Sequence, residues 1–243
     1  MILSMILAAF LLEIVNTSMG MMYGTILAPL LLAWGVEAHV AIPAILFSQA
    51  LGAVGASVTH HRLGNARFIG PSADLEIAAT TAFPALAAVL LGVVVAVQIP
   101  STWVRWYILV VVLSMSVLVL FPREYRFTWW KCWLIGILAG FNKALSGGGY
   151  GPIASIGKIA AGVEAKRSVA TTTLSELLVC GAGFMAYSAA MDTDLQVLWP
   201  LAVGAVGGGL IGPWLAKVIP KEPLRGTIGL LGFVAALWLV AAP

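Results

Sequence analysis

The sequence predicts an all-α integral membrane protein built from two inverted repeats of five segments each. Only 9% of its 243 residues are charged and 61% are hydrophobic, whereas soluble domains average about 25% charged residues. Apolar runs fill nearly the whole chain, and the second half of the chain aligns with the first. We therefore expect about 8 to 10 transmembrane or re-entrant helices, with a broken helical hairpin at the start of each half.

The apolar runs define ten candidate segments, separated by short polar or Gly/Pro-containing breaks. None of the breaks is long enough for a separate soluble domain. The segments are residues 2–18, 21–36, 38–59, 75–97, 103–121, 128–145, 150–163, 167–189, 194–216 and 225–241.

The basic residues are unevenly distributed between these segments. If each run crosses the membrane once, the odd-numbered connections hold ten of the thirteen Lys and Arg residues. By the positive-inside rule these connections are cytoplasmic, so we expect a multi-pass protein of the cell (inner) membrane with both termini outside. The ten residues are Arg62, Arg67, Arg123, Arg126, Lys131, Lys166, Arg167, Lys217, Lys221 and Arg225.

An internal repeat appears when the sequence is aligned with itself at a shift of 127 residues. Gly20 then matches Gly147, Tyr23 matches Tyr150, and the run GVEA at 35–38 recurs at 162–165. At a shift of 120, Ile99-Pro100 and Arg105 match Ile219-Pro220 and Arg225. We expect a first membrane repeat at 1–121 and a second at 128–243. Five segments each would place the two copies in opposite orientations.

Inverted repeats favour a transport function, because two equivalent packings can expose one central site to either side of the membrane. The alternative is a duplicated scaffold with no transport role. The runs at 21–36 and 150–163 would span only about 24 and 21 Å at the helical rise, less than the roughly 30 Å hydrocarbon core. They are predicted to be half-helices of re-entrant hairpins, whose tips at 16–24 and 142–151 meet near the midplane.

The chemistry of the second tip favours an anion. Its run of glycines, Gly147, Gly148 and Gly149, lets backbone N–H groups at the start of a half-helix approach a negative charge. The alternative is that the glycines only allow helices to cross closely. The candidate substrate-binding residues are Asn16, Gly20, Tyr23, Asn142, Lys143, Ser146, Gly147, Gly148, Gly149, Tyr150, Lys158, Thr171, Thr172 and Ser175.

Charged residues inside the apolar runs are candidates because an unpaired charge near the bilayer centre is costly. We expect Lys143 to contact the anion. Lys158 has three open roles: it faces the anion, pairs with Glu176 or snorkels to the cytoplasmic interface. Glu176 is matched by Gln49 in the first half, and these two are the candidate coupling or gating residues, with a structural salt bridge as the alternative for Glu176. Glu13 is either neutral or faces water.

The sequence gives no sign of a metal or cofactor site. Cys132 and Cys180 lack metal-site spacing and are expected to pack in the interior. His39, His60 and His61 lie at segment ends and are expected to be solvated. The scattered basic residues form no patch for a nucleic acid. The expected partners are therefore the lipid bilayer and a small solute.

The second half resembles the TauE/SafE family, also called the toluene sulfonate uptake permease family. The half-repeat of that family reads as a GxGGG run, an apolar stretch, a G-V/L turn and then A-x-G-T-S. The matching residues here are Gly147-Gly148-Gly149, then Gly162-Val163, then Val169-Ala170-Thr171-Thr172. The first half departs from the pattern, with Gly20-Met21-Met22 in place of the triplet and Ala41-Ile42-Pro43 lacking the Thr-Ser.

The resemblance implies a membrane transporter for small sulfur-containing anions such as sulfite, thiosulfate, sulfoacetate or other sulfonates. The leading hypothesis is a secondary transporter that works by alternating access, with a proton or sodium as the possible coupling ion. An anion channel-like pore and an intramembrane enzyme are the alternatives. An enzyme would need a nucleophile and a base, and Cys180 has no histidine partner within its segment.

Overall fold

The structure is a computed structural model, and it describes residues 1–96, 110, 113, 117, 126–190, 194–220, 223, 226–227, 230 and 233–234. Eight helices and no strands lie in these ranges, within a few residues of the apolar runs that predict them. They are α1 (Ile2–Met19), α2 (Tyr23–Ala33), α3 (Ala38–Arg62), α4 (Ala73–Ala96), α6 (Trp129–Ser146), α7 (Tyr150–Ala160), α8 (Ala165–Ala190) and α9 (Leu195–Val218). The expected segments 103–121 and 225–241, with Arg105 and Arg225, fall almost wholly outside the described residues.

Five of these helices, namely α1, α3, α4, α8 and α9, are long and apolar enough to cross a bilayer. Large apolar side chains on their outer faces, such as Leu11, Phe83 and Leu91, are exposed as expected for contact with lipid. By contrast, α2 and α7 have 11 residues each and reach only about 16 Å, half of a hydrocarbon core. The fold is therefore that of a multi-pass membrane protein with two short helices inside it.

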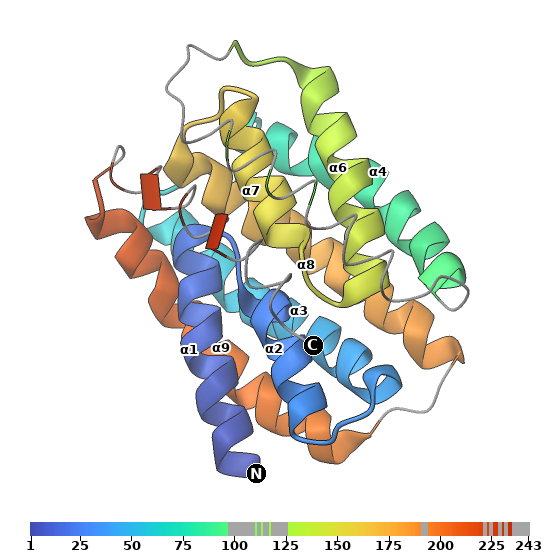
Figure 1. Cartoon of the computed structure of the whole chain (residues 1–243). Helices are drawn as coiled ribbons and strands as arrows, with labels where there is room; N and C mark the ends of the chain where they lie inside the picture. The colour runs from blue at the N-terminus through green and yellow to red at the C-terminus, as the bar shows by residue number, and fades with distance from the viewer. Residues whose placement is uncertain are drawn as a thin grey trace.

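Each short helix follows a sharp break in the chain, and the two breaks have the same backbone form. After α1, Gly20 and Met22 have positive φ angles of 77° and 92°; after α6, Gly147 and Gly149 have φ of 65° and 72°. Residues with side chains rarely adopt this left-handed conformation. Met22 nevertheless adopts it, at the position where the second break has a glycine. These turns reverse the chain and create the hairpins α1–α2 and α6–α7, which enter the bundle from opposite ends (Figure 1).

Long-range packing joins the first helix of each hairpin to a long helix from the other half of the chain. Helix α1 packs along α9, α6 packs along α4, and α3 and α8 cross in the middle (Figure 1). Glycines allow the close packing of α1 with α9 and of α6 with α4. A Cβ on Gly204 or Gly208 of α9 would collide with the α1 backbone. Gly136 and Gly140 of α6 face the α4 backbone in the same way. Such glycine contacts stabilise helix pairs in membranes, where no hydrophobic force draws helices together.

The two ends of the bundle differ in charge. The α3–α4 loop and the first turn of α8 border one pocket and carry Arg67, Lys166 and Arg167. Lys166 also donates from Nζ to the Lys217 carbonyl at 2.7 Å, which brings the end of α9 to the same place. We call this end of the bundle the basic end. The opposite end holds the N-terminus and the α2–α3 turn (Figure 1).

Candidate functional site

The tips of the two hairpins contact each other through their backbones. A Cβ added to Gly148 would lie 2.6 Å from Thr25 N and 2.7 Å from the carbonyl carbon of Gly24. The Gly149 N–H donates to Thr25 Oγ1 at 3.2 Å. These contacts describe close packing at Gly24 and Gly148, and a side chain at either position would push the tips apart.

A second set of contacts crosses the tips from the other side. A Cβ on Gly151 would lie 2.5 Å from the Gly20 carbonyl oxygen, and the Ser155 hydroxyl donates to the same oxygen at 2.9 Å. Asn142 is buried beside Gly149, and the amide of Asn142 occupies the place that a Cβ on Gly149 would take. The backbone of Ser146 ends α6 directly before this turn.

Matching tyrosines fix each short helix to the next long helix. The Tyr23 hydroxyl is 2.8 Å from Ser48 Oγ, and Tyr150 donates to Ser175 Oγ at 2.9 Å. All four residues are buried, and the members of each matched pair are 127 positions apart in the sequence. Tyr23, Tyr150 and Ser175 therefore hold the tips in place through contacts within the protein.

At the two breaks, backbone carbonyl groups that have no helical partner accept hydrogen bonds from side chains at matching positions of the two halves. The Thr17 carbonyl is bonded to His60 Nε2 at 2.9 Å, and the Ala144 carbonyl accepts from the Tyr187 hydroxyl at 2.8 Å. Since the last carbonyls of a helix lack partners within it, these bonds stabilise the ends of α1 and α6. The expectation that His60 is solvated is wrong, because its side chain is fully buried.

Five buried polar residues meet beside the tips, and we call them the central cluster. They are Glu13 and Asn16 from α1, Gln49 from α3, Lys143 from α6 and Glu176 from α8. Asn16 Nδ2 donates to Glu13 Oε2 at 3.3 Å and to Glu176 Oε2 at 3.4 Å. Lys143 Nζ donates to Gln49 Oε1 and forms an ion pair of 3.5 Å with Glu176 Oε1. The cluster thus holds two carboxyl groups and one lysine amine.

The hydrogen bonds of the central cluster cross between the two halves of the chain. At the 127-residue shift Asn16 matches Lys143, and Gln49 matches Glu176. The donor Asn16 bonds Glu176, whereas the donor Lys143 bonds Gln49. Each half therefore supplies one donor to the other half's acceptor, and the cluster ties the two halves together.

Glu13 is the member of the cluster that sequence reasoning did not select. Its Oε1 is buried and has no hydrogen-bond partner within the described ranges. An acidic residue in the middle of an apolar helix, three positions before Asn16, was the available signal. It could not be used without knowing that α6 and α8 bring Lys143 and Glu176 to the same place.

Lys158 lies in a separate buried position on α7. Its Nζ donates to Thr172 Oγ1 at 3.2 Å and to Thr171 Oγ1 at 3.4 Å, and the residue is fully buried. Within the described ranges, no carboxylate lies at ion-pair distance from Nζ. Helical side chains lean towards the helix N-terminus, which for α7 is the tip at Tyr150. The chain therefore extends into the protein, and it neither snorkels nor pairs with Glu176.

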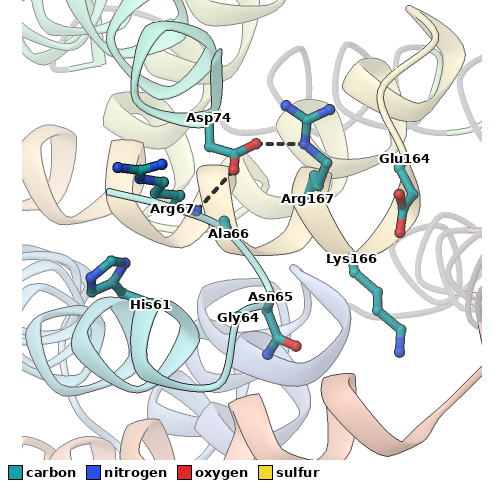
Figure 2. Close-up of a pocket in the computed structure, with 9 residues that line it drawn as sticks. All are labelled: His61, Gly64, Asn65, Ala66, Arg67, Asp74, Glu164, Lys166 and Arg167. Carbon is teal, nitrogen blue, oxygen red and sulfur yellow. Dashed lines mark hydrogen bonds and ion pairs between the residues drawn. The ribbon is translucent and has the colours of Figure 1, made fainter. Parts of the chain in front are cut away.

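A pocket of about 610 Å³ opens at the basic end. Figure 2 shows Asp74 between Arg67 and Arg167. One carboxylate oxygen pairs with Arg167 Nε at 2.5 Å, and the other accepts from the backbone N–H of Arg67 at 2.8 Å. Thr171, which contacts Lys158, donates to the Arg167 carbonyl at 2.7 Å. The pocket therefore lies about one helical turn from the Lys158 position.

The described residues contain no group of His, Cys, Asp and Glu side chains that could hold a metal ion. Both cysteines are buried and free. The thiol of Cys180 lies 3.9 Å from Gln49 Oε1, beside the central cluster.

Comparison with known proteins adds family information to this geometry. A family model described as "Sulfite exporter TauE/SafE" matches residues 5–239. The chain is 25% identical over 237 residues to "Probable membrane transporter protein YtnM" of Bacillus subtilis (strain 168), covering 91% of this chain and 76% of that protein. It is 26% identical over 106 residues to "Probable membrane transporter protein ORF9" of Sinorhizobium sp, covering 44% of this chain and 40% of that protein.

Proposed function

Because this chain belongs to the TauE/SafE family, we propose that it moves a small sulfur-containing anion, such as sulfite, thiosulfate or an organosulfonate, by alternating access. The family and the names of its relatives indicate a membrane transporter rather than an enzyme. We further propose that the chain is built from two inverted repeats, that its basic end is cytoplasmic, and that it contains a defined anion contact and a gate.

The proposed transport unit consists of two inverted repeats, residues 1–121 and 128–243. Support comes from matched lengths: α1 and α6 have 18 residues each, α2 and α7 have 11, and α4 and α9 have 24. The matched tyrosine and carbonyl contacts described above support the same relation. With the basic end cytoplasmic, both termini would face outward.

The proposed anion contact is Lys158 with the hydroxyls of Thr171 and Thr172. The observation that carries it is a fully buried lysine side chain with two hydroxyl partners and no carboxylate at ion-pair distance in the described part of the chain. A buried ammonium without a counter-charge is strongly unfavourable, and a bound anion would supply that counter-charge. Sulfite and sulfonates carry several acceptor oxygens, which suit one ammonium and the O–H donor of Thr172.

The proposed gate is the central cluster. Lys143 is already neutralised by Glu176 and hydrogen-bonded to Gln49, so its charge is less available to a substrate than that of Lys158. Since these bonds link the two halves, breaking and remaking them would accompany the movement of one repeat against the other. Their place beside the tips supports this role.

Binding and flux measurements test the assignment. Purified protein is screened for thermal stabilisation by sulfite, thiosulfate, sulfoacetate, taurine and isethionate, because a ligand that binds the folded state raises its stability. Lys158→Leu, which installs the residue found at the matching position Leu31, should lose both the stabilisation and the flux in proteoliposomes. The matched control is Lys131→Leu, at a half-buried lysine whose Nζ donates to the Arg126 carbonyl, and it should behave like the wild type.

A double variant separates the two buried lysines. Lys143→Met with Glu176→Gln removes both charges of the ion pair, so no unpaired charge is left. If Lys158 binds the anion, this variant keeps the anion-induced stabilisation; if Lys143 does, the stabilisation disappears. Saturable flux with counterflow supports a transporter, whereas flux without saturation or counterflow supports a channel-like pore.

A further inference from the structure

The geometry points to Glu13 as the side chain that binds and releases the proton coupled to transport, an inference that rests on the proposed function. Glu13 is fully buried on α1. Its Oε2 accepts one hydrogen bond from Asn16 Nδ2, at 3.3 Å. Its Oε1 has no partner within the described ranges.

The two carboxylates of the central cluster are unequal. Glu176 has the Lys143 ammonium at 3.5 Å, whereas no cation in the described part of the chain lies at ion-pair distance from Glu13. The amide of Asn16 uses its two hydrogens on the two carboxylates. One ammonium can neutralise one of the two, and the geometry assigns it to Glu176. Glu13 must therefore be neutralised in another way.

A proton is the simplest way to neutralise Glu13, because an unpaired carboxylate in a low-dielectric interior takes up a proton instead of remaining charged. The titratable groups that interact electrostatically with Glu13 are Glu176 and Cys180 on α8, Lys143 on α6 and Tyr23 on α2. Of these, Glu176 opposes a charge on Glu13 and Lys143 favours one. A change in the Lys143–Glu176 distance would therefore change how tightly Glu13 holds its proton.

The other packed helices, α3 and α9, face Glu13 with groups that do not titrate. A Cβ added to Gly52 of α3 would lie 2.8 Å from Glu13 Oε1 and 2.9 Å from the Ala205 carbonyl oxygen of α9. A glycine and a backbone carbonyl carry no positive charge, so these groups of α3 and α9 cannot neutralise a carboxylate at Glu13.

The proposed step forms and breaks one O–H bond. A proton from water on one side of the membrane binds the Glu13 carboxylate, and the same proton leaves to water on the other side after the repeats have moved. No oxidant, reductant or metal takes part. Carried together with a monovalent anion at Lys158, one proton makes the cycle electrically neutral.

Infrared spectroscopy of the purified protein tests the protonation without any substrate. The carbonyl stretch of a protonated buried carboxyl should appear at neutral pH and titrate away as the pH rises. It should be lost in Glu13→Gln and kept in the double variant Lys143→Met with Glu176→Gln, which leaves no ammonium in the central cluster to pair with Glu13. The exposed Glu37, changed to Gln, is the control and should leave the band unchanged. A band that survives in Glu13→Gln, or none in the wild type, overturns the proposal.

Proteoliposomes test the coupling, with isethionate as the probe because its sulfonate does not titrate near neutral pH. In Glu13→Gln, uptake driven by a pH gradient should fall at least tenfold, while exchange of labelled for unlabelled isethionate continues. Uptake that keeps its response to the pH gradient in this variant overturns the coupling role. If the infrared band belongs to Glu13 but isethionate is not moved by the wild type, the proposed substrate fails and the protonation of Glu13 stands.

Discussion

Replacing either buried lysine by leucine should change the stability of the unliganded protein in opposite directions. Taking an ammonium out of water without a counter-charge costs several kcal/mol, and among the described residues no carboxylate lies at ion-pair distance from Lys158 to offset this cost. Its two hydrogen bonds, at 3.2 and 3.4 Å, are long and stabilise by about 0.5 kcal/mol each. Lys158→Leu should therefore stabilise the protein by about 2 kcal/mol.

Lys143→Leu should have the opposite effect. It removes the cation beside Glu176 and leaves this buried carboxylate with no ammonium at ion-pair distance among the described residues. Breaking a buried pair by removing one partner costs about 3 to 5 kcal/mol.

Thermal unfolding in detergent without added anion measures both effects, since 1 kcal/mol shifts the midpoint of a chain this size by about 2 to 4 °C. We expect a rise of about 4 to 8 °C for Lys158→Leu and a fall of about 6 °C or more for Lys143→Leu. Lys131→Leu should leave the midpoint unchanged. A fall for Lys158→Leu would mean that Lys158 has a counter-charge within the protein, and the anion-site reasoning would be refuted.

Three further changes test the tips and the basic end. Gly148→Ala places a Cβ 2.6 Å from the backbone of Thr25, so the melting midpoint should fall by an amount that corresponds to about 1 to 3 kcal/mol. Tyr187→Phe leaves the buried Ala144 carbonyl without its 2.8 Å bond and should cost about 1 to 3 kcal/mol in the same assay; an unchanged midpoint would contradict this. Asp74→Asn removes the charge of a buried carboxylate that pairs with Arg167 and accepts from the Arg67 backbone N–H, and it should cost about 1 to 3 kcal/mol in the same assay. A midpoint equal to that of the wild type would mean that this ion pair does not stabilise the basic end.

The sequence alone determined the membrane class, the segments and the matching of its two halves. These properties depend on local hydropathy and on residue identity at a fixed spacing, which need no knowledge of contacts. The bounds of α1, α3, α8 and α9 therefore agree with the apolar runs to within three residues. The short helices followed from the same counting, because their runs were too short for the bilayer.

Only the tertiary structure decided which charges are neutralised. Lys143 meets Gln49, 94 positions away, and Asn16 meets Glu176, 160 positions away. Nothing in local sequence encodes contacts at such separations, so the sequence predicted an anion contact for Lys143 and left three roles open for Lys158. Helix packing gives Lys143 a carboxylate, brings no cation of the described residues to ion-pair distance from Glu13, and turns Lys158 inward towards hydroxyls. The physical reason is that a charge is neutralised by what lies within about 4 Å of it in space, whatever its distance along the chain.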